Sequence, residues 1–238
     1  MAHFLEKLGW FAVLHRSTNF LDAFRIALVR LIAPNVHLTY SQFGEDAILK
    51  VFFWGQKPGF YIDVGCNHPT KMNNTYLLYQ RGWRGINIDG NQSLINKYKR
   101  CRKRDTNLAV IISDTERPVL FHVSDNDHVS TIDESYKAQT NWEYPKSQQV
   151  QAYTLNTILG RHLPEGTAID LLCVDVEGHD LQVLRSIDLA MYKPTMIVVE
   201  MHHFTLETAG SFEVYNYLLQ QGYKLKYFSV INGYFVRD

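Results

Sequence analysis

Short apolar runs alternate with longer amphipathic segments from residue 60 onward. The most apolar runs are Phe60–Val64, Gly85–Asp89, Ala168–Val174 and Met196–Glu200. They have the length of buried strands, and a segment with helical spacing follows each of them. Strands that alternate with helices indicate an α/β fold with a mainly parallel, doubly wound sheet that carries helices on both faces.

The same patterns predict the remaining elements. Further strands are expected over Leu108–Ser113, Val119–Val123, Gln149–Tyr153, Lys224–Val230 and Tyr234–Val236. Helices are expected over Tyr40–Gln56, Asn74–Arg81, Gln92–Cys101, Leu155–His162, Glu177–Leu189 and Phe212–Gln221. Ser41 is a candidate N-cap for the first of these helices. A turn over Asp114–Pro118 predicts one hairpin, and Asn232-Gly233 predicts an antiparallel hairpin at the C-terminus.

Residues 1–38 are expected to form an N-terminal helical extension, followed by one domain over residues 39–238. Apolar side chains between Phe20 and Leu31 recur at helical spacing, and Pro34 ends the segment. Two interpretations stay open. The extension is either a cap packed on the domain or on a second copy in a homo-oligomer, or an interfacial helix that gives peripheral contact with a membrane.

Charge and composition narrow the class of protein. Lysine plus arginine and aspartate plus glutamate number 24 each, so no basic surface for a nucleic-acid partner is expected. One basic run, Lys97–Arg104, is expected to be a solvated helix end rather than a binding patch. No apolar run is long enough to span a bilayer, and no signal-peptide pattern is found. The three cysteines have no metal-ligand spacing and indicate a reducing compartment. The expected location is cytoplasmic, with the inner face of the membrane as the alternative.

Two strand ends indicate a nucleoside site. Gly65 follows the strand Phe60–Val64 and allows a sharp turn or a close ligand, and Asp89 ends the next strand. An acid at that place is positioned to accept hydrogen bonds from a ribose. The chain has no G-x-G-x-x-G segment, so a pyrophosphate cradle is not expected. A nucleoside cofactor without a diphosphate points to S-adenosylmethionine.

A second site follows the strand Ala168–Val174. Asp175, Glu177, His179 and Asp180 follow one another there, and such a group serves as general base, as metal ligands or as substrate partners. The plainer alternative is a helix N-terminus decorated with acids. A third cluster, Glu200 with His202 and His203, follows the next strand. At most one of these two histidines is expected to face the site, because neighbouring side chains of an extended chain point to opposite sides.

The segments YSQFGED, YIDVGCNHP, NNTYLLYQRGWRGINID, HVSTID, LLCVDVEGHDLQVLRSID and VVEMHH together resemble the FkbM-type methyltransferases. The resemblance covers about residues 39–204. It implies a Rossmann-like class I methyltransferase fold and S-adenosylmethionine-dependent O-methyl transfer. Cys66 stands where the family often has alanine, and Asp89 where glutamate is also common.

The resemblance also implies roles for individual residues. Those expected at the cofactor are Gln42, Glu45, Asp63, Gly65, Asn67, Asp89, Ser113 and Asp114. Those expected at the reacting centre are Asp175, Glu177 and His179. Ser130 and Thr131 are expected over that centre at the acceptor, together with His202. Our sequence-based hypothesis takes His179 as the general base, oriented by Asp175 or Glu177.

A divalent metal held by Asp175, Glu177 and His179, or by His202 in place of His179, is the alternative way to activate a hydroxyl. The expected acceptor is a small molecule or glycan, through a hydroxyl of a sugar, glycan or glycosylated natural product. Trp142 and Tyr144, in the polar loop Ser124–Ser147, are candidates to stack on a sugar. Rival functions are a metal-dependent glycosyltransferase that uses a nucleotide sugar and a non-catalytic cofactor-binding partner subunit.

Overall fold

The computed structural model describes residues 28, 31, 39–124, 130–139 and 141–237. The predicted extension over residues 1–38 therefore lies outside the described residues, apart from Leu28 and Leu31. Among the described residues, no helix combines the length and the apolar character that crossing a membrane requires.

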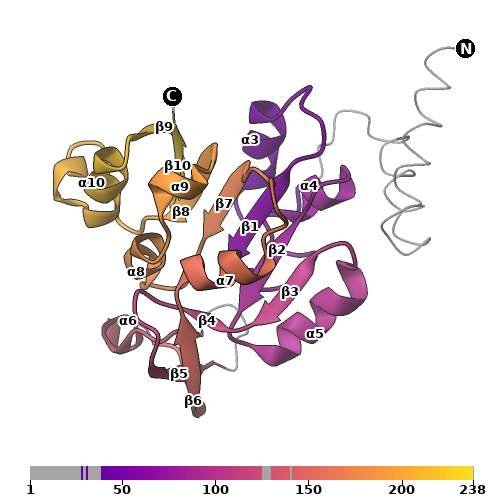
Figure 1. Cartoon of the computed structure of the whole chain (residues 1–238). Coiled ribbons are helices and arrows are strands. Elements are labelled where there is room, and N and C mark those ends of the chain that lie inside the picture. The colour runs from indigo at the N-terminus through magenta and orange to yellow at the C-terminus, as the bar shows by residue number, and fades with distance from the viewer. Residues whose placement is uncertain (1–27, 29–30, 32–38, 125–129, 140, 238) are drawn as a thin grey trace, which may run out of the picture.

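A seven-stranded sheet forms the centre of the protein, in the order β3-β2-β1-β7-β8-β10-β9 (Figure 1). Its strands are β1 (Phe60–Val64), β2 (Arg84–Asp89), β3 (Thr106–Ala109), β7 (Leu171–Val174), β8 (Met196–Glu200), β9 (Tyr223–Ser229) and β10 (Asn232–Arg237). Neighbouring strands among β3, β2, β1, β7 and β8 pair in parallel. Strand β10 is antiparallel to both of its neighbours, β8 and β9. The predicted mainly parallel sheet with an antiparallel C-terminal hairpin is confirmed.

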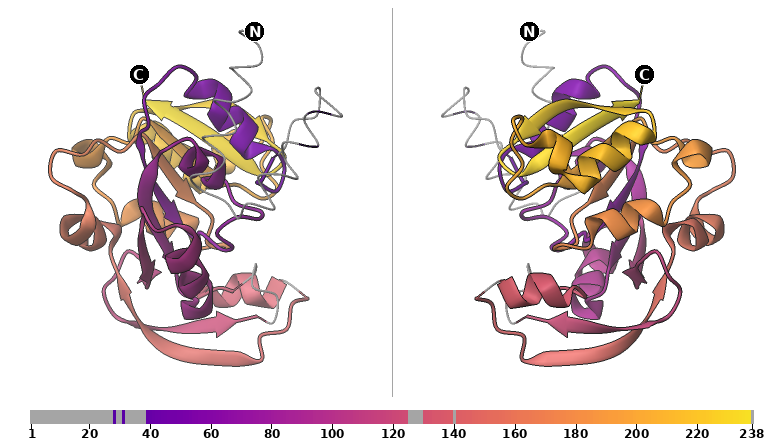
Figure 2. Two further views of the ribbon diagram at one scale, coloured as in Figure 1. Left: turned by 90° about the vertical axis from the view of Figure 1, so that its right-hand side faces the viewer. Right: turned by 90° about the vertical axis from the view of Figure 1, so that its left-hand side faces the viewer.

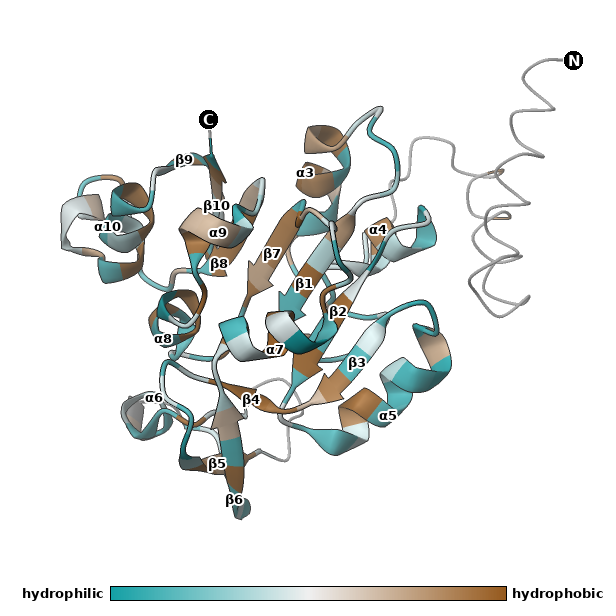
Figure 3. Cartoon of the chain, in the orientation of Figure 1, coloured by the Kyte–Doolittle hydropathy of each residue, from teal (hydrophilic) through white to brown (hydrophobic). Residues whose placement is uncertain are grey.

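Helices cover both faces of this sheet (Figure 2). They are α3 (Glu45–Phe52), α4 (Tyr76–Gln80), α5 (Gln92–Cys101), α7 (Leu155–His162), α8 (Asp180–Arg185), α9 (Leu189–Tyr192) and α10 (Glu213–Gln220). One apolar cluster joins α3 and α4 to the sheet, and a larger one joins α7, α8 and α10 to it. Strand alternation explains the division, since Tyr61 of β1 belongs to the first cluster and Ile62 to the second. Figure 3 shows the hydrophobic colour along β7, as expected for a strand buried on both faces.

A smaller sheet lies beyond the carboxyl ends of the central strands (Figure 1). It has the order β4-β6-β5, with strands β4 (Ile111–Ile112), β5 (Pro118–Val123) and β6 (Lys146–Tyr153), and α6 (Glu134–Gln139) lies beside it. The hairpin predicted around Asp114–Pro118 is wrong, because β4 pairs parallel with β6 and β5 pairs antiparallel with β6. A local turn signal cannot reveal a partner strand as distant as β6, whose Ala152 pairs with Ile111 and whose Gln151 pairs with Pro118.

Three local boundaries also differ from the prediction. Helix α3 begins only at Glu45, after Gly44, and Ser41 accepts from the backbone N–H of Asp46 instead of capping a longer helix. The helix predicted over Glu177–Leu189 begins at Asp180 and ends at Arg185.

The C-terminal turn is formed by residues 230–231, because Asn232 and Gly233 already pair within β10. Packing explains this glycine, since an added Cβ at Gly233 would lie 2.7 Å from the sulfur of Met201. Asn232 in turn donates a hydrogen bond to Oε1 of Glu45 at 2.9 Å. Tertiary contacts therefore determine both residues of the apparent turn motif.

Candidate active site

The strand order reverses between β1 and β7, and ligands of open α/β sheets bind outside the carboxyl ends at such a point. Gly65 follows β1 there with φ +77°, and an added Cβ would lie 1.7 Å from the carbonyl oxygen of Asp175. Only glycine fits this close approach of two strand ends. The sequence signal at Gly65 thus marks the junction of β1 with β7.

A cavity lies on the β2 side of this junction, and we call it the β2-side cavity. Apolar side chains form much of its wall, namely Ile88, Val110, Ile111, Ile112 and Phe121. Its polar residues include Asp89, Ser130, Thr131 and His179. Apolar walls with a few polar groups are typical of a site for a flat heterocycle and its sugar.

Backbone hydrogen bonds hold the carboxylate of Asp89 at the wall of this cavity. Oδ2 accepts from the backbone N–H of Asn67 at 3.0 Å, and Oδ1 accepts from that of Asn91 at 2.7 Å. The side chain of Asn91 caps α5 through the backbone N–H of Ser93. The acid is therefore fixed in place between the end of β2 and the start of α5.

A second cavity of about 260 Å³ lies on the other side of the junction, and we call it the β8-side cavity. Its wall includes Gln42, Tyr136, Trp142, Glu200 and His202. Four residues line both cavities, namely Gly65, Asn67, Asp175 and Glu177. A group bound in one cavity therefore meets a group bound in the other at the ends of β1 and β7.

Carboxylates crowd the β8-side cavity. Burial, together with the neighbouring Glu200, Glu177 and Asp180, raises the pKa of Asp175 well above its ordinary value. Burial and Glu200 also raise the pKa of Glu177 to about 7 and that of Asp180 to about 7. The hydrogen bond to Glu200 raises the pKa of His202. Burial and crowding thus favour the protonated form of these carboxyl groups near neutral pH.

Glu177 is held in place from both of its ends. Its φ is +55°, an uncommon backbone conformation for a residue with a side chain. Its carbonyl oxygen accepts from Thr131 Oγ1 at 3.0 Å, and Tyr136 of α6 donates its hydroxyl to the carboxylate. The smaller sheet and α6 therefore position the residue that separates the two cavities.

His179 lies in the β2-side cavity, whose wall also includes Asp175 and Glu177. Its Nε2 is 3.0 Å from Oγ of Ser113, and the described residues show no hydrogen bond from it to Asp175 or Glu177. Burial lowers its pKa, against the opposing effect of Asp133 and Asp114. The described residues therefore show no contact through which Asp175 or Glu177 orients His179, and its role as general base stays a prediction.

Residues 63–225, well over half of the chain, match the methyltransferase FkbM domain. The chain belongs to the FkbM methyltransferase family. Neither the curated proteins nor the solved structures contain a match. The match includes the shared wall and all residues that line the two cavities except Gln42 and Ile231, so the site described above is the candidate active site of a methyltransferase.

The FkbM domain brings together most of the residues predicted at the cofactor, but not all of them. Gly65, Asn67 and Asp89 line the β2-side cavity, whereas Asp63 and Gln42 line the β8-side cavity. Ser113 reaches the site through His179. Two other residues line neither cavity. Asp114 is exposed, and Glu45 is fully buried between Asn232 and the backbone N–H of Phe43.

The residues predicted at the acceptor divide between the two cavities. Ser130 and Thr131 line the β2-side cavity, and His202 lines the β8-side cavity. Trp142 also lines the β8-side cavity, whereas Tyr144 packs its ring against His122. Of the two adjacent histidines, both exposed, only His202 is among the residues that line the two cavities.

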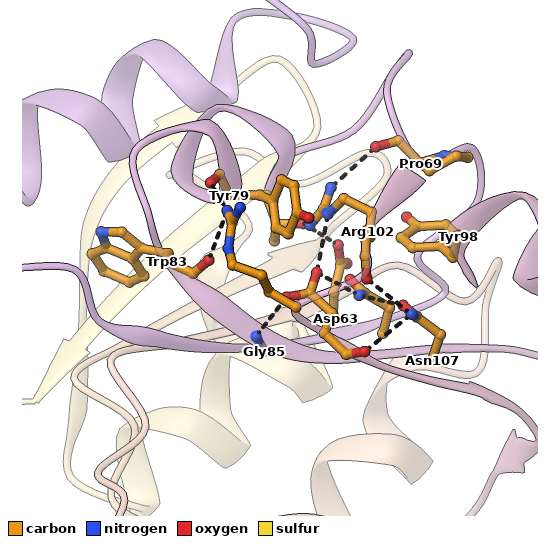
Figure 4. A network of polar contacts seen from close by, with 12 residues as sticks. Asp63, Pro69, Tyr79, Trp83, Gly85, Tyr98, Arg102 and Asn107 are labelled. Carbon is orange, nitrogen blue, oxygen red and sulfur yellow. Dashed lines mark hydrogen bonds and ion pairs between the residues drawn. The ribbon is translucent and has the colours of Figure 1, made fainter. Parts of the chain in front are cut away.

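Sequence reasoning missed one residue behind the site. Arg102 was predicted to lie in a solvated helix end, but its side chain is fully buried (Figure 4). Its guanidinium forms an ion pair with Asp105 at 3.0 Å and donates to the carbonyl oxygen of Pro69 at 3.0 Å and to Thr75 Oγ1 at 2.9 Å. Thr75 in turn donates to Asp63 at 2.7 Å. A basic run in the sequence carries no signal that one of its members points inward.

Proposed function

We propose that this FkbM methyltransferase is a class I, S-adenosylmethionine-dependent O-methyltransferase that acts on a hydroxyl of a sugar, glycan or glycosylated natural product. The observation that carries the proposal is the pair of cavities that share one wall at the β1–β7 junction. One cavity has the composition of a nucleoside site, and the other is polar and large enough for part of a second substrate.

The residues present fit S-adenosylmethionine. Asp89 is fixed by backbone N–H groups and suits the ribose hydroxyls, and the walls formed by Ile88 and Phe121 suit the adenine. Asp63, Gly65 and Asn67 are placed for the methionine portion. When bound, the cofactor supplies a methyl group on a positively charged sulfur. A positive sulfur near Asp175 and Glu177 would favour the ionised form of these two acids, which in turn stabilises the sulfonium.

Methyl transfer to an alcohol needs collinear alignment of the nucleophile, the methyl carbon and the sulfur. The main task of the protein is therefore to position the acceptor hydroxyl relative to the cofactor. The shared wall supplies this positioning through Asp175 and Glu177, with Glu177 held by Tyr136 and Thr131. Trp142, 49% exposed at the β8-side cavity, offers an aromatic face to a sugar. These features favour a hydroxylated acceptor.

We assign His179 to cofactor binding rather than to proton transfer, because it lies with Ser113 in the β2-side cavity. The change His179→Ala is expected to raise KM for S-adenosylmethionine while kcat at saturating cofactor changes by less than threefold. A fall in kcat of about 100-fold with unchanged cofactor affinity would restore the role of general base, whose typical contribution is ~10²–10⁴-fold.

Thermal unfolding with S-adenosylhomocysteine, NAD, a nucleotide sugar with Mn²⁺, and Mn²⁺ alone tests the cofactor class. A ligand that binds only the native state raises the midpoint, by an amount that grows with its concentration. We expect S-adenosylhomocysteine to raise the midpoint of unfolding. NAD should not raise it, and the nucleotide sugar should not raise it beyond the effect of Mn²⁺ alone. A shift with the nucleotide sugar beyond that of Mn²⁺ alone, and none with S-adenosylhomocysteine, would favour the glycosyltransferase.

Matched variants locate the nucleoside site. Asp89→Asn is expected to weaken S-adenosylhomocysteine binding at least tenfold in calorimetry, because it replaces a fixed carboxylate at the cavity wall. Glu165→Gln is the control, since Glu165 is exposed and lies outside both cavities. Equal affinities of the two variants would refute the assignment of Asp89.

The acceptor is then sought by measuring S-adenosylhomocysteine release with a panel of glycans and glycosylated natural products. Release that is independent of any of them would argue against this acceptor class.

A further inference from the structure

Three side chains from the ends of β7 and β8 meet at one wall of the β8-side cavity. Glu177, Glu200 and His202 each offer one ligand atom, and these atoms lie within 4.8 Å of one another. All three residues line the cavity, so a small ion there would be accessible from it. Carboxylate oxygens and an imidazole nitrogen are common ligands of divalent cations.

Glu200 supplies an independent sign of a ligand site. It is only 8% exposed, and among the described residues its Oε2 has no hydrogen-bond partner. Its other oxygen, Oε1, lies 3.0 Å from Nε2 of His202. A buried carboxylate oxygen without a partner is costly unless a cation or a hydrogen-bond donor satisfies it.

Lysine and arginine do not supply that partner. Within the described ranges, no ion pair joins a lysine or arginine to Asp175, Glu177, Asp180 or Glu200. Three of these acids, Asp175, Glu177 and Glu200, line the β8-side cavity, with the partly exposed His202 as the nearest group able to become positive. Such an arrangement offers carboxyl oxygens to a dication, whose charge would favour their ionised form.

We propose that Glu177, Glu200 and His202 form a divalent-cation site that opens into the β8-side cavity. The cation would take one oxygen from each carboxylate and Nε2 from the imidazole, and its remaining positions would face the cavity. With two hard oxygen ligands and one imidazole, the set suits a cation such as Mn²⁺. Hydroxyl groups of a ligand in the cavity could fill the open positions.

The ligand set differs from the one expected from the sequence. His179 is engaged by Ser113 in the other cavity, and Asp175 is not among the grouped ligand atoms. Glu200 replaces them, because the carboxyl end of β8 lies beside that of β7 in the parallel sheet. The site also stands independently of methyl transfer, since it rests on the protein's own side chains.

The test is a titration of the metal-stripped full chain with Mn²⁺ without any cofactor, in which electron paramagnetic resonance reports free Mn²⁺. We expect one saturable site per chain, weakened at least tenfold by Glu200→Gln and by His202→Asn. The matched controls Glu207→Gln and His203→Asn change exposed neighbours outside the cavity and should bind as the parent protein does.

Circular dichroism and thermal unfolding of the four variants establish that each is folded. Absence of saturable binding to the folded parent protein would overturn the proposal, and so would unchanged affinity in the folded Glu200→Gln and His202→Asn variants. Because the readout is cation binding alone, a failure here leaves the binding of S-adenosylhomocysteine as a separate result. Conversely, saturable Mn²⁺ binding in a protein without affinity for S-adenosylhomocysteine would support the cation site and refute the proposed cofactor.

Discussion

Replacing Arg102 by methionine should destabilise the protein severely. The guanidinium is fully buried and makes five side-chain hydrogen bonds, to Asp105, Pro69, Asn73, Tyr61 and Thr75. Methionine has a similar length but neither charge nor donors. The change would leave the buried carboxylate of Asp105 and several oxygen acceptors without their cation.

The magnitude follows from the ion pair. The side chains of Arg102 and Asp105 are both 0% exposed, and removal of one partner of such a pair typically costs about 3–5 kcal/mol. Orphaned acceptors add roughly 1–3 kcal/mol each, although these costs overlap and do not sum. Since a domain is stable by only about 5–15 kcal/mol, the expected loss is a large fraction of the total. Arg102→Lys keeps the positive charge but loses the planar set of guanidinium donors, so we expect an intermediate loss of stability.

Urea unfolding at pH 7, followed by circular dichroism, measures these losses. Arg100→Met is the matched control, because Arg100 belongs to the same basic run but is exposed, and surface changes usually fall within about 0.5 kcal/mol. The expected order of stability is parent protein and Arg100→Met, then Arg102→Lys, then Arg102→Met. An Arg102→Met protein within about 1 kcal/mol of the parent would refute the reasoning.

Three further predictions concern the site and its surroundings. Gly65→Ala should abolish S-adenosylhomocysteine binding in calorimetry or prevent folding, because the new Cβ meets the Asp175 carbonyl oxygen, whereas Gly160→Ala meets open space and should be neutral or slightly stabilising in thermal unfolding. Burial raises the pKa of Asp63 to about 6, so the native state holds this proton more tightly than the unfolded chain does, and stability is lost as pH rises from about 4 through 6. Asp63→Asn removes that loss, so its stability relative to the parent protein should rise by about 3 kcal/mol over this range in urea unfolding, and a pH-independent difference would contradict the argument. Tyr136→Phe removes the hydroxyl that holds Glu177 and should lower kcat more than it changes cofactor affinity; an unchanged kcat would contradict that positioning role.

The sequence predicted the central sheet well because periodicity and strand length are local properties. Buried runs such as Phe60–Val64 and Met196–Glu200 can hardly be anything other than strands of a parallel sheet, and both were placed within the observed bounds. The error at residues 232–233 has a different origin. An Asn-Gly pair is a strong turn signal on its own, but here Glu45 and Met201, far away in sequence, determine what the two residues do.

For a similar reason, the sequence indicated the strand ends at which the candidate site lies but not how neighbouring residues divide between its two cavities. Acids and a histidine within five residues of Asp175 suggest one cluster, yet the turn at Glu177 and Gly178, both with positive φ, separates them. Glu177 then lines both cavities, whereas His179 lines only the β2-side cavity. The backbone dihedral angles of the turn decide which cavity each of these residues lines. These angles cannot be predicted from the sequence of the motif.

If the proposed function holds, stability and S-adenosylhomocysteine binding are coupled through the buried guanidinium of Arg102. The loop after β1 lines both cavities through Asn67 and other residues, and Arg102 holds this loop at Pro69 and, through Thr75, contacts Asp63 of β1. A change at Arg102 that leaves the protein folded should therefore also weaken S-adenosylhomocysteine binding. Glu200→Gln should not, because Glu200 lines only the β8-side cavity. The two variants thus separate a defect in the loop that carries the cofactor from a defect in the proposed cation site.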